Sequence, residues 1–419
     1  MSVTVEELRA HIATIDSEIQ LQRKLLEKLE RDKSLAQRQL NVALDPVARL
    51  PLEISSQIFL HALPTSPSEE QDVPTVLLRI CHAWTDIALD TPPLWTTFCI
   101  HFPCSDHFAE VLPIWFRRAR NFPLSVSIFL CGPSSNWNHC VSDELWRHGG
   151  QLKHLEILDN DGLDPDDGLD LFGDTTSVSL PFLQTLTIRC QREQRVYLAS
   201  RILQLLRGAP NIAEIIFDQV RTQNNLHSEI LVLPTLRRLI HRKFTSINDY
   251  IFHYLALPAL ESFSLRTPWI TGDGLVAFFE RSAPPLWDWD LTRGWQPDGI
   301  QPFHLHKCLR LIPTLTRFTL REPDSNAVAE LFAALAESPS LLANLHNLTI
   351  QIRNTSANRI TNPWWRNLVR ALSTRPVEQL YIVPVEVSPP MDVLTSLQEL
   401  AAAGAKMHVG TEEQNFVIA

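Results

Sequence analysis

Apolar residues in the first forty positions recur at alternating steps of three and four. Residues 3 to 42 contain neither proline nor glycine and are rich in Glu, Lys, Arg, Gln and Leu. A repeat sustained over about five heptads predicts a coiled coil or one long amphipathic helix. An apolar seam this narrow is not expected to stay exposed to water. It either pairs with a second copy of the chain or packs against the rest of the same chain, and we favour self-association. Its polar breaks could fix the register, although they weaken the zipper. The seam consists of Val5, Leu8, Ile12, Ile15, Ile19, Gln22, Leu26, Leu29, Lys33, Ala36 and Leu40.

A different pattern, apolar-x-x-apolar-x-apolar, recurs after residue 110. In six of nine repeats a proline lies two residues before the start, where it breaks the preceding helix and leads into an extended strand. Helical stripes such as Ile202, Leu205 and Leu206 lie between the predicted strands. A strand followed by a helix at this period is typical of a leucine-rich-repeat solenoid. The repeats begin, at intervals of 24 to 32 residues, at Leu152, Leu183, Ile212, Leu236, Leu260, Leu286, Leu315, Leu345 and Val377.

Two features depart from that repeat. The asparagine that usually follows the third apolar position is present only as Asn160, and His241 occupies a position where an apolar residue is expected. We therefore expect an irregular solenoid. The structural alternative is a doubly wound α/β domain, but the chain has only 13 glycines and lacks the glycine-rich phosphate turns of that class. Before the first repeat, residues 111 to 130 predict a helix and a strand that form an N-terminal cap.

Between these two regions, residues 45 to 98 predict a pair of short helices. Pro51 suits the first turn of a helix, and Glu53 is favourable at its positive end. Ile54, Ile58 and Ala62 then recur at helical spacing. The pattern predicts a second helix from Val76 to Ile87, with Leu77, Ile80, Cys81 and Trp84 on one side. The polar segment from Thr65 to Asp72 predicts a loop between the helices.

The same stretch resembles an F-box in the motifs Leu50-Pro51-Leu52-Glu53, Ile58-Phe59, Cys81-His82-Ala83-Trp84 and Leu94-Trp95. F-boxes dock onto the small Skp adaptor of cullin–RING ubiquitin ligases. A long N-terminal helix that runs into an F-box is typical of the large F-box families of mushroom-forming fungi, which this chain resembles. The alternative is an ordinary helical hairpin packed on the rest of the chain. The resemblance implies that the adaptor-binding face is formed or supported by Leu50, Pro51, Ile54, Ile58, Phe59, Leu78, Cys81 and Trp84.

Together these patterns predict an irregular leucine-rich-repeat-like α/β solenoid, preceded by a small all-α F-box and a long N-terminal helix. We expect an amphipathic or coiled-coil helix over residues 1–43, an F-box over 44–98, and the solenoid with its cap over 110–419.

Composition narrows the classes of partner and compartment. The chain of 419 residues carries 37 basic and 47 acidic residues, a net charge of -10, which argues against general binding to nucleic acid or anionic membranes. Its seven cysteines form an odd set without a Cys-x-x-Cys pair, so neither a disulfide framework nor a zinc cage is indicated. No signal-peptide pattern and no apolar run of about 20 residues is present. We therefore expect a reducing compartment, the cytoplasm or the nucleus.

Motifs for catalysis, cofactors and metals are absent from the sequence. Neither a Gly-x-Ser-x-Gly elbow nor a phosphate-binding loop, a dinucleotide glycine fingerprint or a His-Glu-x-x-His helix occurs. His304, His306 and Cys308 alternate at steps of two, which on a helix places them on different faces. The aspartates between Asp159 and Asp174 do not follow the order of a calcium loop and indicate a solvated acidic loop. We expect no enzymatic activity, no cofactor and no metal.

Residues that alternate with the buried positions of each predicted strand point to the open face of the sheet. The outermost such column reads Leu158, Arg189, Asp218, Arg242, Arg266, Thr292, Arg321, Gln351 and Val383. Its four arginines, Arg189, Arg242, Arg266 and Arg321, are a candidate basic track for an acidic or phosphorylated segment of a cargo protein. The competing interpretation, which we favour, is that these arginines pair with Asp218, Asp288, Asp290 and Glu214 on adjacent strands.

The leading functional hypothesis is a substrate receptor of a cullin–RING ubiquitin ligase that brings cargo close to the catalytic subunits. The main rival is a non-ligase interaction scaffold with a degenerate F-box, because Leu52 stands where the family often has a second proline. An enzyme whose site is spread over loops is the third possibility, for which no reactive set converges. The sequence does not identify the cargo.

Overall fold

The computed structural model describes residues 4–63, 73–160, 169–172, 178–191, 196–223, 229–242, 250–266, 272–292, 305–323, 325–352, 362–375, 377–385 and 387–417. The described residues form a large parallel sheet of 12 strands together with twelve α-helices, which confirms the α/β class. The chain divides into two compact units. Unit 1 comprises Met1–Phe98 and Trp115–Phe122, and unit 2 comprises Cys99–Ile114 and Pro123–Ala419.

Unit 1 is helical and begins with the long helix α1 (Val5–Leu44). The prediction of one helix from the heptad pattern is therefore confirmed. The apolar seam of α1 is exposed along its length, so no described part of unit 1 covers it. The elements that follow are η1 (Val47–Arg49), α2 (Leu52–His61), α3 (Val73–Ile80), α4 (His82–Leu89) and η2 (Pro92–Trp95).

The single helix predicted from Val76 to Ile87 is wrong, because the structure has two helices, α3 and α4, in that stretch. Cys81 separates them with an extended backbone, at φ -161° and ψ 167°. The Thr85 hydroxyl lies 3.1 Å from the Leu78 carbonyl oxygen and 3.0 Å from that of Cys81, so it satisfies backbone acceptors that the break exposes. The loop predicted over Thr65 to Asp72 lies outside the described residues.

In unit 2 the strands of the large sheet lie side by side in chain order, and every pair whose register is defined is parallel. Each of the nine predicted repeats contributes one strand, which begins at its first apolar position or two residues later; these strand positions are confirmed. The sheet is formed by β1 (Thr97–Phe102), β2 (Leu124–Leu130), β3 (Leu152–Asp159), β4 (Thr185–Cys190), β6 (Glu214–Asp218), β9 (Arg238–Arg242), β11 (Ser262–Arg266), β12 (Asp288–Thr292), β13 (Arg317–Arg321), β14 (Asn347–Gln351), β15 (Gln379–Val383) and β16 (Lys406–Val409). Two small parallel pairs join β5 (Val196–Leu198) to β7 (Arg221–Gln223) and β8 (Leu231–Val232) to β10 (Leu255–Ala256).

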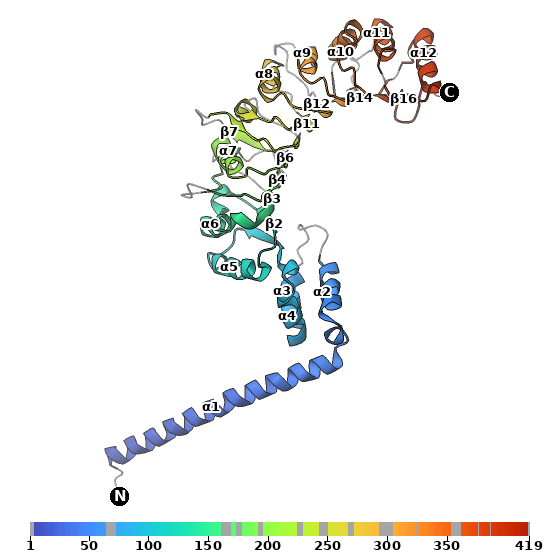
Figure 1. The fold of residues 1–419 in the computed structure, drawn as a ribbon. Helices are drawn as coiled ribbons and strands as arrows, with labels where there is room; N and C mark the ends of the chain where they lie inside the picture. The colour runs from blue at the N-terminus through green and yellow to red at the C-terminus, as the bar shows by residue number, and fades with distance from the viewer. Residues whose placement is uncertain are drawn as a thin grey trace. The chain divides into compact units, whose positions relative to one another are not determined.

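Helices lie between most of these strands. Figure 1 shows α6 to α12 along one face of the unit 2 sheet, so that the opposite face carries none of these described helices. A helix and a strand are present in the stretch predicted as a cap over residues 111 to 130, as most of α5 and as β2. The helices are α5 (Phe108–Ala119), η3 (Ser134–Asn136), α6 (His139–Arg147), η4 (Gly149–Gln151), α7 (Ala199–Arg207), η5 (Tyr250–Tyr254), α8 (Gly272–Ser282), α9 (Leu305–Arg310), α10 (Ser325–Glu337), α11 (Asn362–Leu372) and α12 (Met391–Ala402).

Two buried rows of side chains run across this sheet from strand to strand. Strand alternation places the second and third apolar positions of each repeat on the same face, and the parallel register aligns them between neighbours. All members of both rows are buried, so the rows form the core of unit 2. One row contains Leu155, Leu186, Ile215, Leu239, Phe263, Trp289, Phe318, Leu348, Leu380 and Met407, and the other contains Ile157, Ile188, Phe217, His241, Leu265, Leu291, Leu320, Ile350, Ile382 and Val409.

Neighbouring repeats are also joined by short polar side chains that follow the prolines. Asn211 Nδ2 donates to the Pro181 carbonyl at 2.7 Å, and Thr235 Oγ1 donates to the Pro210 carbonyl at 2.9 Å. Thr314 Oγ1 donates at 2.8 Å to the carbonyl of Leu286, the first apolar position of the preceding repeat, as Thr235 Oγ1 also does to that of Ile212. These bonds bridge adjacent repeats before the strands begin, whereas the asparagine expected from the usual repeat would act after the strands end.

His241 is fully buried in the second row, between Phe217 and Leu265. Burial holds its pKa well below the ordinary value of 6.5, so the folded chain keeps the imidazole neutral where the unfolded chain is protonated. The stabilisation is complete above pH 6.5 and is lost as the pH falls below it, by about 1.4 kcal/mol per pH unit. We expect the free energy of unfolding of His241→Leu to lack this component of the pH dependence.

Urea unfolding of the wild type and of His241→Leu at pH 7.5, 6.5 and 5.5 measures how the free energy of unfolding of each protein depends on pH. His253→Leu, at an exposed position in η5, is the control and should leave the slope of the wild type unchanged. Equal slopes for the wild type and His241→Leu would show that His241 is protonated in the folded state.

Candidate interaction surfaces

The predicted docking residues of unit 1 leave an apolar surface open at α2. Leu50 is 41% exposed, Ile54 50% and Ile58 43%. Ile54 and Ile58 are one turn apart on the same side of α2, and Leu50 precedes that helix in an extended conformation. Pro51 is also exposed, and its carbonyl accepts from the Ile54 and Ser55 amides at 3.0 and 3.1 Å, which starts the helix. Large apolar side chains in water favour a partner that covers them.

Asp45 fixes the segment that carries this surface. It lies between α1 and η1, and its carboxylate accepts from the Val47 amide at 2.8 Å. Oδ2 also accepts from the indole N–H of Trp84 and lies 3.9 Å from the Cys81 sulfur. One carboxylate therefore ties the end of α1 to the start of α4. Sequence reasoning missed Asp45; the available signal was an aspartate before proline at the end of a long helix.

The inner side of α2 is fixed by a buried aromatic pair and a buried hydroxyl. Phe59 is only 1% exposed, and its ring centroid lies 4.9 Å from that of Trp84. Ser55 is buried and donates to the Val47 carbonyl at 2.9 Å. Phe59 thus supports the predicted face from inside and does not form its surface. The other three predicted residues are half-buried, and their exposure is intermediate between that of the exposed Ile54 and that of the buried Phe59: Leu78, Cys81 and Trp84.

The Leu94-Trp95 motif lies in the buried core of unit 1. Both side chains are fully buried, and the Trp95 indole donates to the Ala88 carbonyl at 2.8 Å. Trp115 donates to the Trp95 carbonyl at 2.9 Å, and the guanidinium of Arg118 lies 4.5 Å from the centre of the Trp95 ring. Burial lowers the pKa of Arg118. Trp115 and Arg118 belong to the part of α5 that unit 1 includes, Trp115–Phe122 being grouped with Met1–Phe98.

The predicted column of residues on the open face of unit 2 is present as a register row. Leu158, Arg189, Asp218 and Arg242 are consecutive register partners. A second run of partners joins Arg266, Thr292, Arg321, Gln351 and Val383. The structure therefore brings the four candidate cargo-binding arginines to one edge of the same sheet face.

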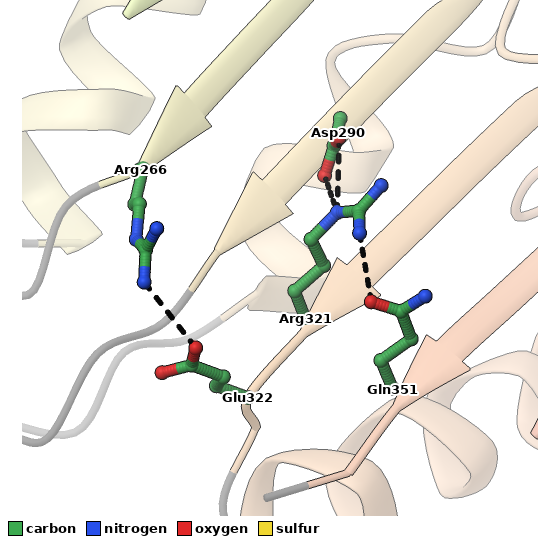
Figure 2. Close-up of polar contacts among 5 residues, drawn as sticks. All are labelled: Arg266, Asp290, Arg321, Glu322 and Gln351. Carbon is green, nitrogen blue, oxygen red and sulfur yellow. Dashed lines mark hydrogen bonds and ion pairs between the residues drawn. The ribbon is translucent and has the colours of Figure 1, made fainter. Parts of the chain in front are cut away.

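Three of these arginines are engaged by carboxylates. Arg321 Nε lies 3.0 and 3.1 Å from the two carboxylate oxygens of Asp290, and its Nη1 donates to Gln351 Oε1 at 2.7 Å, as Figure 2 shows. Arg266 Nη2 lies 3.4 Å from Glu322, which follows β13 (Figure 2). Arg189 lies 3.5 Å from Glu156. The predicted partner Asp290 is correct, whereas Glu156 and Glu322 were missed.

Arg242 differs from the other three. It is exposed and lies beside Asp218 in the register, but within the described ranges no ion pair of its guanidinium is present. Glu214, another predicted partner, pairs at 3.3 Å with Arg238, in a different column. All these ion pairs involve partly exposed side chains, so each contributes on the order of 0–1 kcal/mol and can be exchanged for another anion.

The structure adds little to the search for a metal site. No group of three or more His, Cys, Asp or Glu with metal-binding geometry occurs among the described residues. Cys308 is buried, which raises the pKa of its thiol to about 12 and keeps it protonated; His304 lies outside the described residues. Of the acidic cluster, Asp170 pairs with Arg201 at 2.8 Å and Asp159 is buried, while the aspartates at 161, 164, 166, 167 and 174 lie outside the described residues.

Comparison with known proteins gives no family for the chain. No protein-family model matches it, and no curated protein is significantly similar to it. The resemblance of residues 45 to 98 therefore depends on their own motifs and geometry. Among the described helices, none is both long and apolar enough to span a lipid bilayer.

Proposed function

We propose that this chain is a substrate-recognition adaptor of a cullin–RING ubiquitin ligase. Residues 44–98 act as an F-box that docks on the Skp adaptor, and unit 2 holds the cargo protein. The observation that carries the proposal is the exposed apolar trio Leu50, Ile54 and Ile58, mounted on a helix whose other side is fixed by Asp45, Phe59 and Trp84. The open apolar surface consists of Leu50, Ile54 and Ile58, three of the eight residues that the F-box resemblance implies for the adaptor-binding face.

The energetics of the trio suit a docking site. Burying the remaining exposed area of three branched apolar side chains contributes roughly 1 kcal/mol each. The side chains also lie on a preorganised segment, so little conformational entropy is lost on binding. A few well-packed apolar anchors commonly dominate the affinity of such interfaces.

Unit 2 fits an irregular leucine-rich-repeat-like solenoid. Its strands follow one another in chain order at the period of the repeats, and each of the ten strands of the large sheet from β3 to β16 contributes one residue to each buried row. Bonds from Asn211, Thr235 and Thr314 join three pairs of neighbouring repeats. A sheet face without helices offers a continuous surface for a protein partner.

The mechanism is proximity. The chain supplies no reacting group; it holds the cargo near the catalytic subunits of the ligase, so that transfer to a cargo lysine becomes effectively intramolecular. A non-ligase scaffold would bind partners through the same repeats but would have no use for a Skp-binding face. The two functions are therefore separated by adaptor binding alone.

Co-purification of the full chain with a Skp-type adaptor tests the proposal. We expect an equimolar complex that survives size-exclusion chromatography at micromolar concentrations. A chain that is folded by circular dichroism but elutes apart from the adaptor would refute the ligase function and leave the scaffold.

A second prediction concerns the cargo. Replacing Arg242 and Arg266 together by glutamate should lower cargo recovery at least about 10-fold, because charged contacts to an acidic segment become repulsive. Skp binding should be unchanged. Cargo proteins recovered by proximity labelling in cells provide the measurement.

The matched control reverses two exposed arginines on the helical side of unit 2, Arg310 in α9 and Arg370 in α11. It makes the same change in net charge away from the open face. If both double variants recover cargo as the wild type does, the four-arginine track is not the cargo site.

A further inference from the structure

The apolar seam of α1 is exposed to solvent and therefore favours a binding partner. We propose that a second copy of this chain covers it, forming a parallel, in-register, two-stranded coiled coil. The α1 helix has 40 residues, and its seam is exposed along the whole length. At a rise of about 1.5 Å per residue this is a rod of about 60 Å, long enough for a stable pairing.

The residue types in the seam favour two strands. In the heptad frame three of the six a positions are β-branched (Val5, Ile12 and Ile19), and two of the five d positions are leucine (Leu8 and Leu29). β-Branched residues at a with leucine at d favour parallel dimers over larger assemblies.

The charges beside the seam select the parallel orientation. In a parallel pair each g position faces the next e position of the second copy, so Glu18 meets Arg23 of the second copy. Two-fold symmetry repeats this attractive pair. Both side chains are exposed on α1.

The antiparallel alternative brings like charges together. With the seams fully overlapped, g positions face g positions and e positions face e positions. Glu18 then meets Asp32 of the second copy, and Asp16 meets Glu30 of the second copy. Both pairs are repulsive and occur twice, so charge discriminates between the two orientations.

The polar breaks select the register. In a parallel pair without offset, Gln22 faces Gln22 and Lys33 faces Lys33 across the seam, with Asp32 of the second copy beside the Lys33 ammonium group. An offset of one heptad places Gln22 against Ile15 or Leu29 and Lys33 against an apolar leucine, which leaves polar groups without partners.

The dimer brings two docking surfaces and two repeat units into one particle. A cargo with two recognition segments, or an oligomeric cargo, then binds with an avidity that one copy lacks. The pairing itself is independent of the proposed ligase function.

Sedimentation equilibrium of the full chain between 1 and ~50 μM tests the dimer. We expect twice the chain mass of 47.7 kDa for the wild type. Leu26→Glu places two carboxylates in the seam and should raise the dissociation constant at least about 100-fold, giving the monomer mass. Leu21→Glu makes the same change at an exposed leucine off the seam and should remain dimeric.

Three results overturn the proposal: a monomeric wild type, a mass above the dimer, or a dimer that persists in Leu26→Glu. Far-UV circular dichroism of both variants confirms that unit 2 stays folded, so that loss of mass reports pairing alone.

Cysteine cross-linking tests the orientation. In the parallel pair position 15 faces itself, so Ile15→Cys should form a disulfide-linked dimer on oxidation at least about 10-fold faster than the off-seam control Leu21→Cys. In the antiparallel pair position 15 faces position 33. A cross-link that forms only when Ile15→Cys is mixed with Lys33→Cys would replace the parallel arrangement by the antiparallel one.

Discussion

Replacing Ile58 by aspartate should abolish binding of the chain to the Skp adaptor while both units stay folded. Ile58 is 43% exposed on α2, one turn after Ile54, so the substitution removes an apolar anchor and adds a charge within the proposed interface. An unpaired carboxylate in an apolar interface costs several kcal/mol, which corresponds to a loss of affinity of at least about 100-fold. Calorimetric titration of the variant with the adaptor measures this loss.

Leu52→Asp is the matched control on the same helix. Leu52 is likewise exposed and apolar, but at 100° per residue it lies about 160° around α2 from Ile54. We expect its adaptor affinity to stay within about threefold of the wild type. Equal losses in both variants would mean that α2 as a whole, and not the Leu50, Ile54 and Ile58 surface, determines binding. An unchanged affinity in Ile58→Asp would remove the assignment of the docking surface.

Helical spacing was enough to place Ile54 and Ile58 on one side of α2, but it did not separate them from the adjacent Phe59, which the structure buries. The break at Cys81 was not predictable, since apolar periodicity continues from Leu77 to Trp84 and no proline or glycine interrupts it. At the break the Thr85 hydroxyl bonds to the Leu78 and Cys81 carbonyls, and the Asp45 carboxylate lies 3.9 Å from the Cys81 sulfur. The contact from Asp45 joins residues 36 apart in the sequence, so local patterns carry no sign of it.

In the repeats, too, some features were predictable from local patterns and others were not. The period-two alternation of the strands was enough to predict that Arg189, Asp218 and Arg242 share one row. It could not identify Glu322 as the partner of Arg266, because Glu322 lies beyond the end of a strand. The last strand, β16, was missed because its repeat begins with Gly404 where the others have a large apolar residue.

A second large effect is expected at Arg375, which follows α11 and is only 7% exposed. Its Nη2 lies 2.8 Å from the Leu335 carbonyl oxygen, 2.9 Å from that of Ser338 and 2.8 Å from that of Leu341. Nη1 donates to the Ala371 carbonyl at 2.6 Å. The guanidinium thus satisfies backbone acceptors at the end of α10, in the turn before β14 and at the end of α11. Its positive charge also complements the negative ends of both helices.

Arg375→Met keeps most of the apolar volume but leaves those carbonyl groups buried without donors. Hydrogen bonds to charged groups contribute about 1.5–3 kcal/mol, and buried acceptors without partners add their own desolvation cost. We therefore expect the free energy of unfolding to fall by about 3 kcal/mol in urea titrations. The free energy of unfolding of Arg375→Lys should lie between those of Arg375→Met and the wild type, because an ammonium group cannot reproduce the planar set of donors of a guanidinium.

Arg370→Met is the control, since Arg370 is exposed on α11 only five residues earlier. The free energy of unfolding of Arg370→Met should fall by no more than about 0.5 kcal/mol. If Arg375→Met and Arg370→Met are equally stable, the backbone carbonyls around Arg375 must find other donors. In that case the junction between α10 and α11 would depend on apolar packing and not on the buried guanidinium. A selective loss at Arg375 would instead show that one charged side chain joins two consecutive repeats where the sequence provides no asparagine to do so.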